Sequence, residues 1–337
     1  MPVRTTRHLT DLTGAARTAP PRWTEDEVAV LAAALTAAPS VHNSQPWSLR
    51  LRDRTATVFE RVDITLPRHD PMGRDRLVSC GAAVANLRLA VRRLGWTAPW
   101  RQFPDQAAPG AVAEVEAGGP AEPTETELAG YGAIARRSSH RGPFAAEPVD
   151  PALLRSLRDT AADVEVPGVV AHVLRGEDRT HLARVLSHSA LVLRQDDAYQ
   201  RELAAWRGGE GIATADAPWS LPWAGLVDRT TAVPDDTVLA ERLARESYLV
   251  VGTTGDGRSD HLHAGMLTQR LWLAAVAAGL ACSIMTQPLH VPESRAGLIE
   301  RLELAGYPQV LVRLGHPAHP PRPTSRRPLA EVVHIED

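Results

Sequence analysis

Two long stretches rich in alanine and leucine, residues 77–96 and 261–280, resemble each other when one is shifted by 184 positions. Five positions are then identical, among them Gly81 with Gly265. Each stretch has the spacing of an amphipathic helix and ends near a glycine, which commonly terminates helices. Convergence of two Ala/Leu-rich helices would give a similar pattern. Gly81 recurs as Gly265, and the terminal Gly95 recurs as Gly279. The repeat therefore favours duplication and predicts two modules in one chain.

A dense polar turn, residues 39–47 with the sequence PSVHNSQPW, follows a predicted helix over 28–35. Pro39 stops that helix. Ser40, Asn43 and Gln45 carry donors and acceptors that can bond either local backbone or a ligand. The turn can be read as a polar connection above a buried tryptophan, or as a site for a flat heterocycle. For a generic turn of this composition the first interpretation is the more common one; the family resemblance described below favours the second.

A second motif, Arg137-Ser138-Ser139-His140-Arg141, places two guanidinium groups four residues apart with hydroxyls between them. Arginine forms charge-assisted bonds with phosphate, and hydroxyls and loop N–H groups can bond the remaining oxygens. A solvated basic turn is the alternative interpretation. A third motif, Arg326-Arg327-Pro328, would be an ordinary tail if it stood alone.

The order of predicted elements divides the chain into residues 24–103, a linker over 104–124 and a second module over 125–333. Thr24 is expected to cap the first helix, and the strands 47–52 and 55–60 to form a hairpin. The linker holds one short strand candidate, near 111–115. In the second module we expect helices over 125–135, 151–161, 176–204 and 261–279, strands over 169–174, 248–253 and 309–315, and a lid insertion with three tryptophans at about 206–235.

Composition excludes several classes of protein. The formal net charge is −3, which gives no global field for nucleic acid or an anionic membrane. All 37 basic residues are arginine, so no Schiff-base or phosphate-loop lysine exists. No stretch reaches the ~18 apolar residues of a membrane helix, and a cytoplasmic protein is expected. Two histidine pairs, His261 with His263 and His316 with His319, lack a carboxylate partner in sequence, and no metal is expected.

Together the three motifs resemble the Acg family of fused, FMN-binding nitroreductase-like proteins. The segments 66–74, 137–144 and 201–206 look like segments of that family. Members usually have Arg-Arg-Thr-Asn-Arg at residues 137–141, so the second arginine is absent here, although Arg136 is adjacent. The resemblance implies an α+β nitroreductase fold, with two tandem sheet-and-helix modules fused as a pseudo-dimer. Each ligand motif occurs once, which implies a single FMN.

The resemblance also implies roles for individual residues. The Arg137–Arg141 motif would hold the phosphate and the pyrimidine side of the FMN, and Arg326 or Arg327 would complete phosphate binding. The polar turn would contact the polar edge of the flavin ring. A loop after the second long helix would place a backbone N–H near the flavin N5. The cofactor-binding residues expected are Pro39, Ser40, Asn43, Gln45, Arg137, Ser138, Ser139, Arg141, Ser283, Ile284, Met285, Arg326 and Arg327.

The activity implied is FMN-dependent and NAD(P)H-using reduction of a small organic acceptor, such as a nitroaromatic, a quinone or an activated double bond. No catalytic side chain is expected, because the flavin carries the chemistry. The chain would act as a monomer that mimics a dimer. A protein that sequesters FMN with little turnover is the alternative, because a tryptophan-rich lid over 206–235 would exclude substrate.

Overall fold

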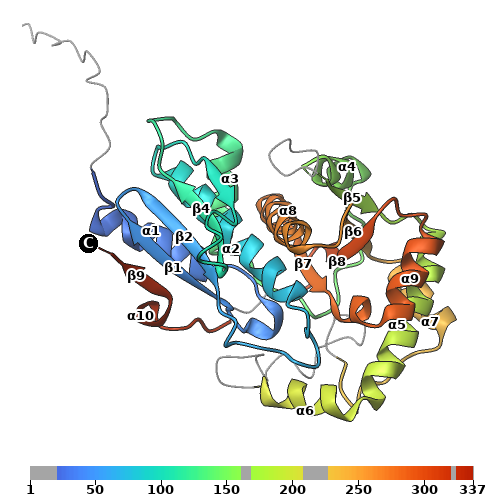
Figure 1. The fold of residues 1–337 in the computed structure, drawn as a ribbon. Coiled ribbons are helices and arrows are strands. Elements are labelled where there is room, and N and C mark those ends of the chain that lie inside the picture. The colour runs from blue at the N-terminus through green and yellow to red at the C-terminus, as the bar shows by residue number, and fades with distance from the viewer. Residues whose placement is uncertain (1–20, 161–167, 208–226, 320–323, 337) are drawn as a thin grey trace, which may run out of the picture.

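The structure, a computed structural model, describes residues 21–160, 168–207, 227–319 and 324–336. Two sheets with their covering helices form the α+β arrangement that the sequence predicts (Figure 1). The helices are α1 Glu25–Thr36, α2 Arg74–Arg93, α3 Glu125–Ile134, α4 Pro151–Asp159, α5 Asp178–Gln195, α6 Asp197–Ala205, α7 Asp236–Leu243, α8 Arg258–Ala277, α9 Pro292–Arg301 and α10 Leu329–Val332, with short 3-10 turns η1 Val41–Asn43 and η4 Gln287–His290. The strands are β1 Trp47–Arg52, β2 Thr55–Glu60, β3 Trp100–Gln102, β4 Ala111–Glu116, β5 Val169–Val173, β6 Ser247–Thr253, β7 Ala281–Met285, β8 Tyr307–Gly315 and β9 Val333–Ile335.

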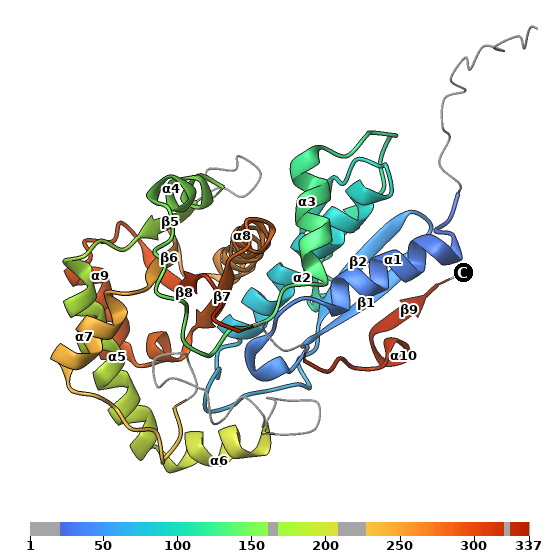
Figure 2. The same cartoon turned by 180° about the vertical axis from the view of Figure 1, so that it is seen from behind.

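The first sheet has the strand order β3-β4-β2-β1-β9. Its central hairpin, β1 with β2, confirms the predicted pairing and turns at Asp53-Arg54. Side chains alternate along β1, where Leu49 and Leu51 are buried and Arg50 is exposed, as the two-residue period of a strand requires. Helices α1 and α2 cover the buried face, as Figure 2 shows.

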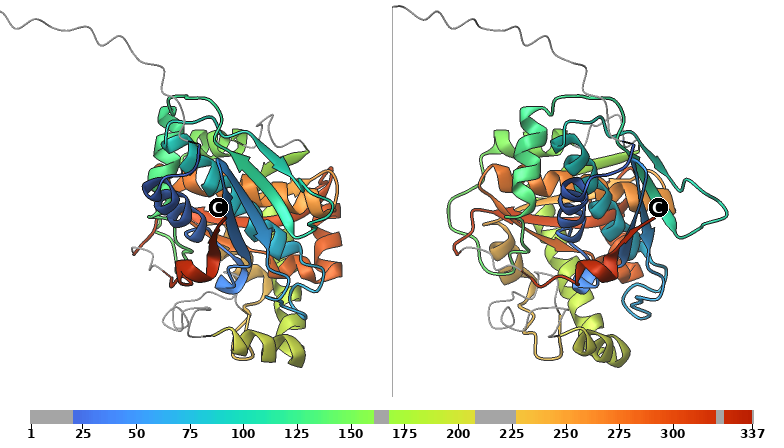
Figure 3. Two further views of the ribbon diagram at one scale, coloured as in Figure 1. Left: turned by 60° about the vertical axis from the view of Figure 1, so that its left-hand side comes forward. Right: turned by 90° about the vertical axis from the view of Figure 1, so that its left-hand side faces the viewer.

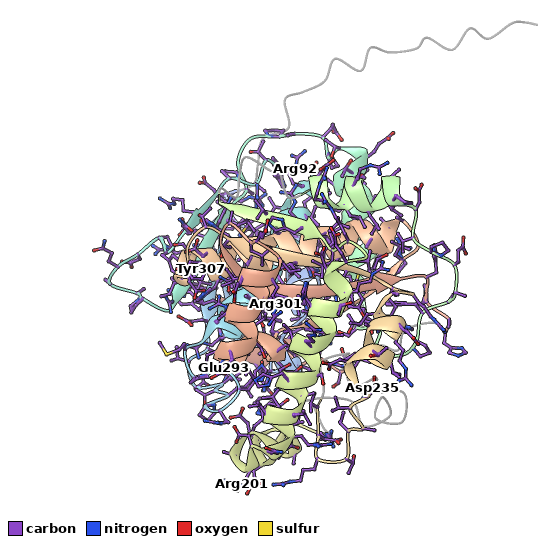
Figure 4. All side chains as sticks on the ribbon, turned by 90° about the vertical axis from the view of Figure 1, so that its right-hand side faces the viewer. Arg92, Arg201, Asp235, Glu293, Arg301 and Tyr307 are labelled. Atoms are coloured by element: carbon purple, nitrogen blue, oxygen red, sulfur yellow. The ribbon has the colours of Figure 1, made fainter. Side chains whose placement is uncertain are left out.

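The second sheet is antiparallel throughout, in the order β5-β6-β8-β7. Both of its faces are covered, so its strands are apolar on both sides. Leu249 and Val251 pack in the core that contains α8, whereas Tyr248 and Val250 pack in a separate core with α5, α7 and α9. Figure 4 shows this outer layer, with Glu293 and Arg301 on α9 and Asp235 at the start of α7.

The two long helices α2 and α8 cross between the sheets (Figure 1) and make the most extensive helix contact in the structure. Their backbones touch at the two repeated glycines. A methyl group on Gly81 would lie 2.0 Å from the carbonyl oxygen of Leu262, and one on Gly265 would lie 2.0 Å from that of Val78. Because the contacts are reciprocal under the 184-residue shift, the helix pair has the self-complementary pattern of a two-fold interface.

Local sequence signals place many helix ends correctly. Thr24 and Glu27 form a capping box at the start of α1, as predicted from Thr24. Asp150 caps α4 with Pro151 at its first position. After α2 and α8 the chain turns at Gly95 and Gly279, which have φ of 87° and 83°, the left-handed conformation that ends helices.

Three local predictions differ from the structure. The expected linker 104–124 contributes β4 to the first sheet, where it pairs with both β2 and β3. The expected helix 176–204 is broken into α5 and α6, because Asp196 caps the second helix by accepting from the N–H groups of Ala198 and Tyr199. The expected loop 282–285 is part of β7, paired with β8.

The C-terminal segment returns to the first module. Strand β9 pairs in parallel with β1, with Leu49 opposite Val333 (Figure 3). The expected second module therefore supplies an edge strand to the first sheet. Of the expected lid at about 206–235, residues 208–226 lie outside the described residues, and Val227 packs with α5 and α6.

Candidate functional site

A cleft lies where the polar turn 39–47 faces α8 and β7. Its walls come from both modules: from the polar turn and α2 on one side, and from α8, β7 and the segment 139–141 on the other. Seventeen residues line it: Pro39, Ser40, Val41, His42, His69, Asp75, Val78, Ser79, Ala82, Ser139, Arg141, Gly265, Thr268, Trp272, Ile284, Thr286 and Gln287. The polar turn and the Arg137–Arg141 motif, called the rear arginine motif below, are about a hundred residues apart in sequence. They nevertheless share one cavity.

The polar turn is held in an unusual backbone conformation. His42, Asn43 and Gln45 have φ of 49°, 56° and 49°, a left-handed region that costs energy for residues with a side chain. Two side chains stabilise it. Ser40 Oγ accepts from the N–H of Gln45 at 2.9 Å, and Ser79 Oγ on α2 accepts from the N–H of Val41 at 3.2 Å. Strain that the surroundings maintain in this way is typical of a binding site.

The polar turn also binds the C-terminal arginine segment. Asn43 Nδ2 donates to the carbonyl of Ser325 at 3.1 Å, and Gln45 Oε1 accepts from the N–H of Arg327 at 2.9 Å. Gln45 is fully buried and its Nε2 donates to the carbonyl of Asn43. The amide of Gln45 thus joins the first and third motifs.

The rear arginine motif is hydrogen-bonded to strands β7 and β8 of the second sheet. Ser139 forms a parallel bridge with Cys282 of β7, and the N–H of His140 donates to the Cys282 carbonyl at 2.8 Å. Arg313, fully buried on β8, donates to the carbonyls of His140 and Gly142. These bonds direct Ser139 and Arg141 into the cleft, opposite the polar turn.

A buried guanidinium group, that of Arg137, and a partly buried one, that of Arg326, meet beside the cleft. Arg137 Nη2 and Arg326 Nη2 each donate to the carbonyl of Ala37, at 3.3 Å in both cases. Arg137 also lies over the ring of Trp272, which lines the cleft, with 4.6 Å between guanidinium carbon and ring centroid. Burial and the nearby Arg326 charge lower the pKa of Arg137 to about 9, and burial lowers the pKa of Arg326.

The arginine pair has the chemistry of an anion site. The Nε atoms of Arg137 and Arg326 are buried and have no hydrogen-bond partner. Within the described ranges, neither guanidinium pairs with a carboxylate. Two like charges out of water are unfavourable unless a negative charge joins them. A phosphate would supply that charge together with acceptors for both Nε–H groups.

The predicted residues fall into three groups. Pro39, Ser40, Ser139, Arg141 and Ile284 line the cleft. A second group surrounds the arginine pair or supports the polar turn, and consists of Asn43, Gln45, Arg137, Arg326 and Arg327. The third group is buried away from the cavity lining: Ser138, Ser283 and Met285, the last in the core shared with α5 and α9.

Several lining residues were not singled out from the sequence. His42 lies inside the polar turn. His69 lies within the 66–74 segment, which the resemblance alone brought into the argument, and Asp75 directly follows that segment. Gly265 and Thr268 are one helical turn apart on α8, and both border the cavity. Burial lowers the pKa of His42 well below its ordinary value, so its ring is neutral at pH 7.

The sequence model of the Nitroreductase family matches residues 134–316. A Mycobacterium tuberculosis H37Rv protein named "Putative NAD(P)H nitroreductase Rv3131" is 33% identical over 310 residues, which cover 88% of each chain. Another from the same strain, named "Putative NAD(P)H nitroreductase acg", is 31% identical and covers 88% of this chain and 92% of its own. The solved FMN-dependent nitroreductase NfnB from Mycobacterium smegmatis is 16% identical, with a TM-score of 0.41 over 62% of this chain and 99% of its own.

Two sheet-and-helix modules share a cleft beside which two arginines meet, and the sequence relatives define the family. This chain belongs to the nitroreductase family and is an Acg-like member of it. The resemblance drawn from the three motifs is confirmed. In the described part of the chain, no helix combines the length and apolar character needed to cross a membrane.

Proposed function

We propose that the cleft binds one FMN and that the protein uses NAD(P)H to reduce small organic acceptors, such as nitroaromatics, quinones or activated double bonds. One observation carries this proposal: the polar turn and the rear arginine motif line the same cavity, beside Arg137, which is buried, and Arg326, which is partly buried, and neither has a carboxylate partner in the described ranges. The names of the relatives, NAD(P)H nitroreductases, support the choice of reductant.

In this proposal Arg137 and Arg326 hold the phosphate, and Arg141 and Ser139 bond the pyrimidine side of the ring. Ser40 and the backbone of the polar turn contact the ring edge. Asn43 and Gln45 hold the turn and the C-terminal segment in place, rather than reaching into the cavity. When bound, FMN would supply the two-electron chemistry, while these residues bind and orient it. Positive charge from Arg141 would favour the anionic reduced ring.

We further propose that the chain is a pseudo-dimer that needs no second subunit to complete its cleft. The reciprocal contacts of Gly81 and Gly265 support a duplicated helix pair. The cleft takes α2 and the polar turn from one module, and α8 and β7 from the other. In a dimer of single modules, the same cleft would lie between two chains.

Anaerobic mixing of the purified flavoprotein with NADPH, and separately with NADH, tests the activity. The proposal predicts rapid bleaching of the flavin absorbance, followed by its recovery when a nitroaromatic or quinone is added. A flavin that stays oxidised with both nucleotides would contradict turnover and would support the sequestering alternative. That alternative arises from the segment 206–235, most of which lies outside the described residues.

A further inference from the structure

Three histidines gather around one buried carboxylate at the edge of the cleft. His69 Nε2 lies 3.0 Å from Asp75 Oδ2, and His290 Nε2 lies 3.1 Å from the same oxygen. The ring of His42 packs against that of His69, with centroids 4.7 Å apart, and the ring of His290 does so at 4.5 Å. The side chains of His69 and Asp75 are almost fully buried, whereas 15% of the His290 side chain is exposed.

The arrangement of the three ligand atoms differs from a simple hydrogen-bonded triad. His69 Nε2 has good hydrogen-bonding geometry to Asp75 Oδ2, whereas His290 Nε2 lies equally close to that oxygen with poorer alignment. One ligand atom from each residue lies within 4.8 Å of the other two. An ion about 2.0–2.2 Å from each atom requires neighbouring ligands to be about 3 Å apart or slightly more. Both histidine-to-carboxylate separations have this value.

Neighbouring groups orient the candidate ligands. Thr286 Oγ1 donates to Asp75 Oδ2. Arg74 donates to the carbonyl of Leu289 at 3.2 Å, next to His290, and its Nε lies 3.4 Å from the other Asp75 oxygen. The backbone N–H of His69 donates to a carboxylate oxygen of Glu202 on α6 at 2.8 Å. Metal ligands are commonly fixed by such outer contacts.

We propose that His69, Asp75 and His290 form a binding site for a divalent transition-metal ion of the zinc type. Imidazole and carboxylate ligands suit zinc, and three protein ligands with an open fourth position are typical of a catalytic rather than a structural site. No spacing pattern in the sequence points to this site, because the ligands come from the loop before α2, the first turn of α2 and η4. The histidine pairs considered from sequence lie elsewhere.

The open position faces the cleft, since His69, Asp75 and Thr286 line it. A water molecule or an oxygen atom of a bound acceptor would complete the coordination, and the ion would then polarise a nitro or carbonyl oxygen. That role rests on the proposed function. Metal binding itself does not, because the ligands are distinct from the residues assigned to FMN.

The test uses the full-length protein after treatment with a chelator and removal of the chelator. Zinc chloride is titrated by calorimetry, and cobalt chloride by visible absorption, in the wild type and in His290→Gln and Asp75→Asn. His172→Gln, a change at a half-buried histidine of β5 outside the cluster, is the matched control. Circular dichroism and FMN content establish that each variant is folded.

We expect one zinc ion per chain in the wild type and in His172→Gln. His290→Gln should bind at least about 100-fold more weakly, beyond the 10–100-fold typical of losing an outer contact. His290 is partly exposed on a short turn, so this variant decides the matter even if Asp75→Asn fails to fold. Wild-type occupancy near zero, or zinc affinity unchanged in His290→Gln, would overturn the proposal, whatever the result of the NADPH experiment.

Discussion

Arg137 and Arg326, one from each end of the second module's sequence, donate to the same acceptor, the carbonyl oxygen of Ala37. Neither has a carboxylate partner among the described residues, and burial lowers the pKa of both. Arginine nevertheless stays protonated at neutral pH. The protein therefore keeps one buried and one partly buried positive charge at the position where the proposed FMN phosphate would bind.

Replacing Arg137 by methionine should weaken FMN binding and stabilise the FMN-free protein. Loss of a charge-assisted bond should cost about 1.5–3 kcal/mol of FMN binding energy. Removal of an uncompensated buried charge should raise the free energy of unfolding of the apoprotein by about 1 kcal/mol or more. Fluorescence titration with FMN and chemical denaturation of the stripped protein measure the two effects.

Arg136→Met is the control for that experiment, because Arg136 is exposed and adjacent in sequence. It should change neither quantity by more than about 0.5 kcal/mol. An Arg137→Met apoprotein that is strongly destabilised while still binding FMN normally would show that Arg137 is structural.

The contact between α2 and α8 predicts that alanine substitutions at Gly81 and Gly265 lower the free energy of unfolding by similar amounts. Gly81→Ala and Gly265→Ala each place a methyl group against backbone, and each should cost about 1–3 kcal/mol or more. Gly132→Ala in α3, where nothing lies within 4 Å, should instead stabilise the protein by about 0.5–1 kcal/mol. Denaturant unfolding measures all three, and a large difference between the first two would argue against a two-fold helix pair.

Much of the fold follows from local sequence, because its determinants are local. Thr24, Asp150, Gly95 and Gly279 mark helix ends through their own side chains or backbone freedom, and the hairpin of β1 and β2 follows from alternation. The motifs at 39–47 and 137–141 were also recognisable because each is continuous. Their sharing of one cavity was an expectation drawn from the family resemblance.

The remaining features depend on contacts distant in sequence. Strand β9 is only three residues long, and it pairs with β1, which lies more than 280 positions earlier in the sequence. Strand β7 has five residues that are buried or nearly so, and it is too short to show a period that would predict a strand. The cluster of His69, Asp75 and His290 brings together segments more than two hundred residues apart, and no spacing rule would identify it.

Gln45→Leu tests the connection between the polar turn and the C-terminal arginines. The change keeps the side chain's approximate size but removes its bonds to Arg327 and Asn43. It removes the acceptor of the part-buried Arg327 N–H, so we expect a loss of about 1–3 kcal/mol in stability. FMN binding should also weaken, because the segment that carries Arg326 is released. Gln106→Leu, at an exposed position, is the control and should show neither effect. Normal FMN affinity in Gln45→Leu would show that this connection is unimportant for the cofactor.

Acid stability should depend on Asp256, between β6 and α8. Burial alone would raise its pKa, but hydrogen bonds from Arg295 and Gln309 outweigh that effect and hold the pKa of Asp256 below its ordinary value. A carboxylate with a lowered pKa in the folded state contributes stability above its unfolded pKa, about 3.9, and loses it as the pH falls through the folded pKa.

Asp256→Asn should therefore lower the melting temperature at pH 6 to 7, and the difference from the wild type should shrink as the pH is lowered below about 4. Thermal unfolding monitored by circular dichroism across this pH range measures it. A difference that stays constant with pH would show that the charge on Asp256 contributes nothing.

The central claim is that residues of both modules hold one FMN in a single cleft. The most direct test is the flavin stoichiometry of the purified protein reconstituted with excess FMN, measured for the wild type, for Arg137→Met and for a variant in which Asn43, Ser44, Gln45 and Pro46 are replaced. The account predicts one FMN per chain in the wild type and markedly reduced occupancy in both variants. Two FMN per chain in the wild type, or full occupancy in either variant, would contradict it.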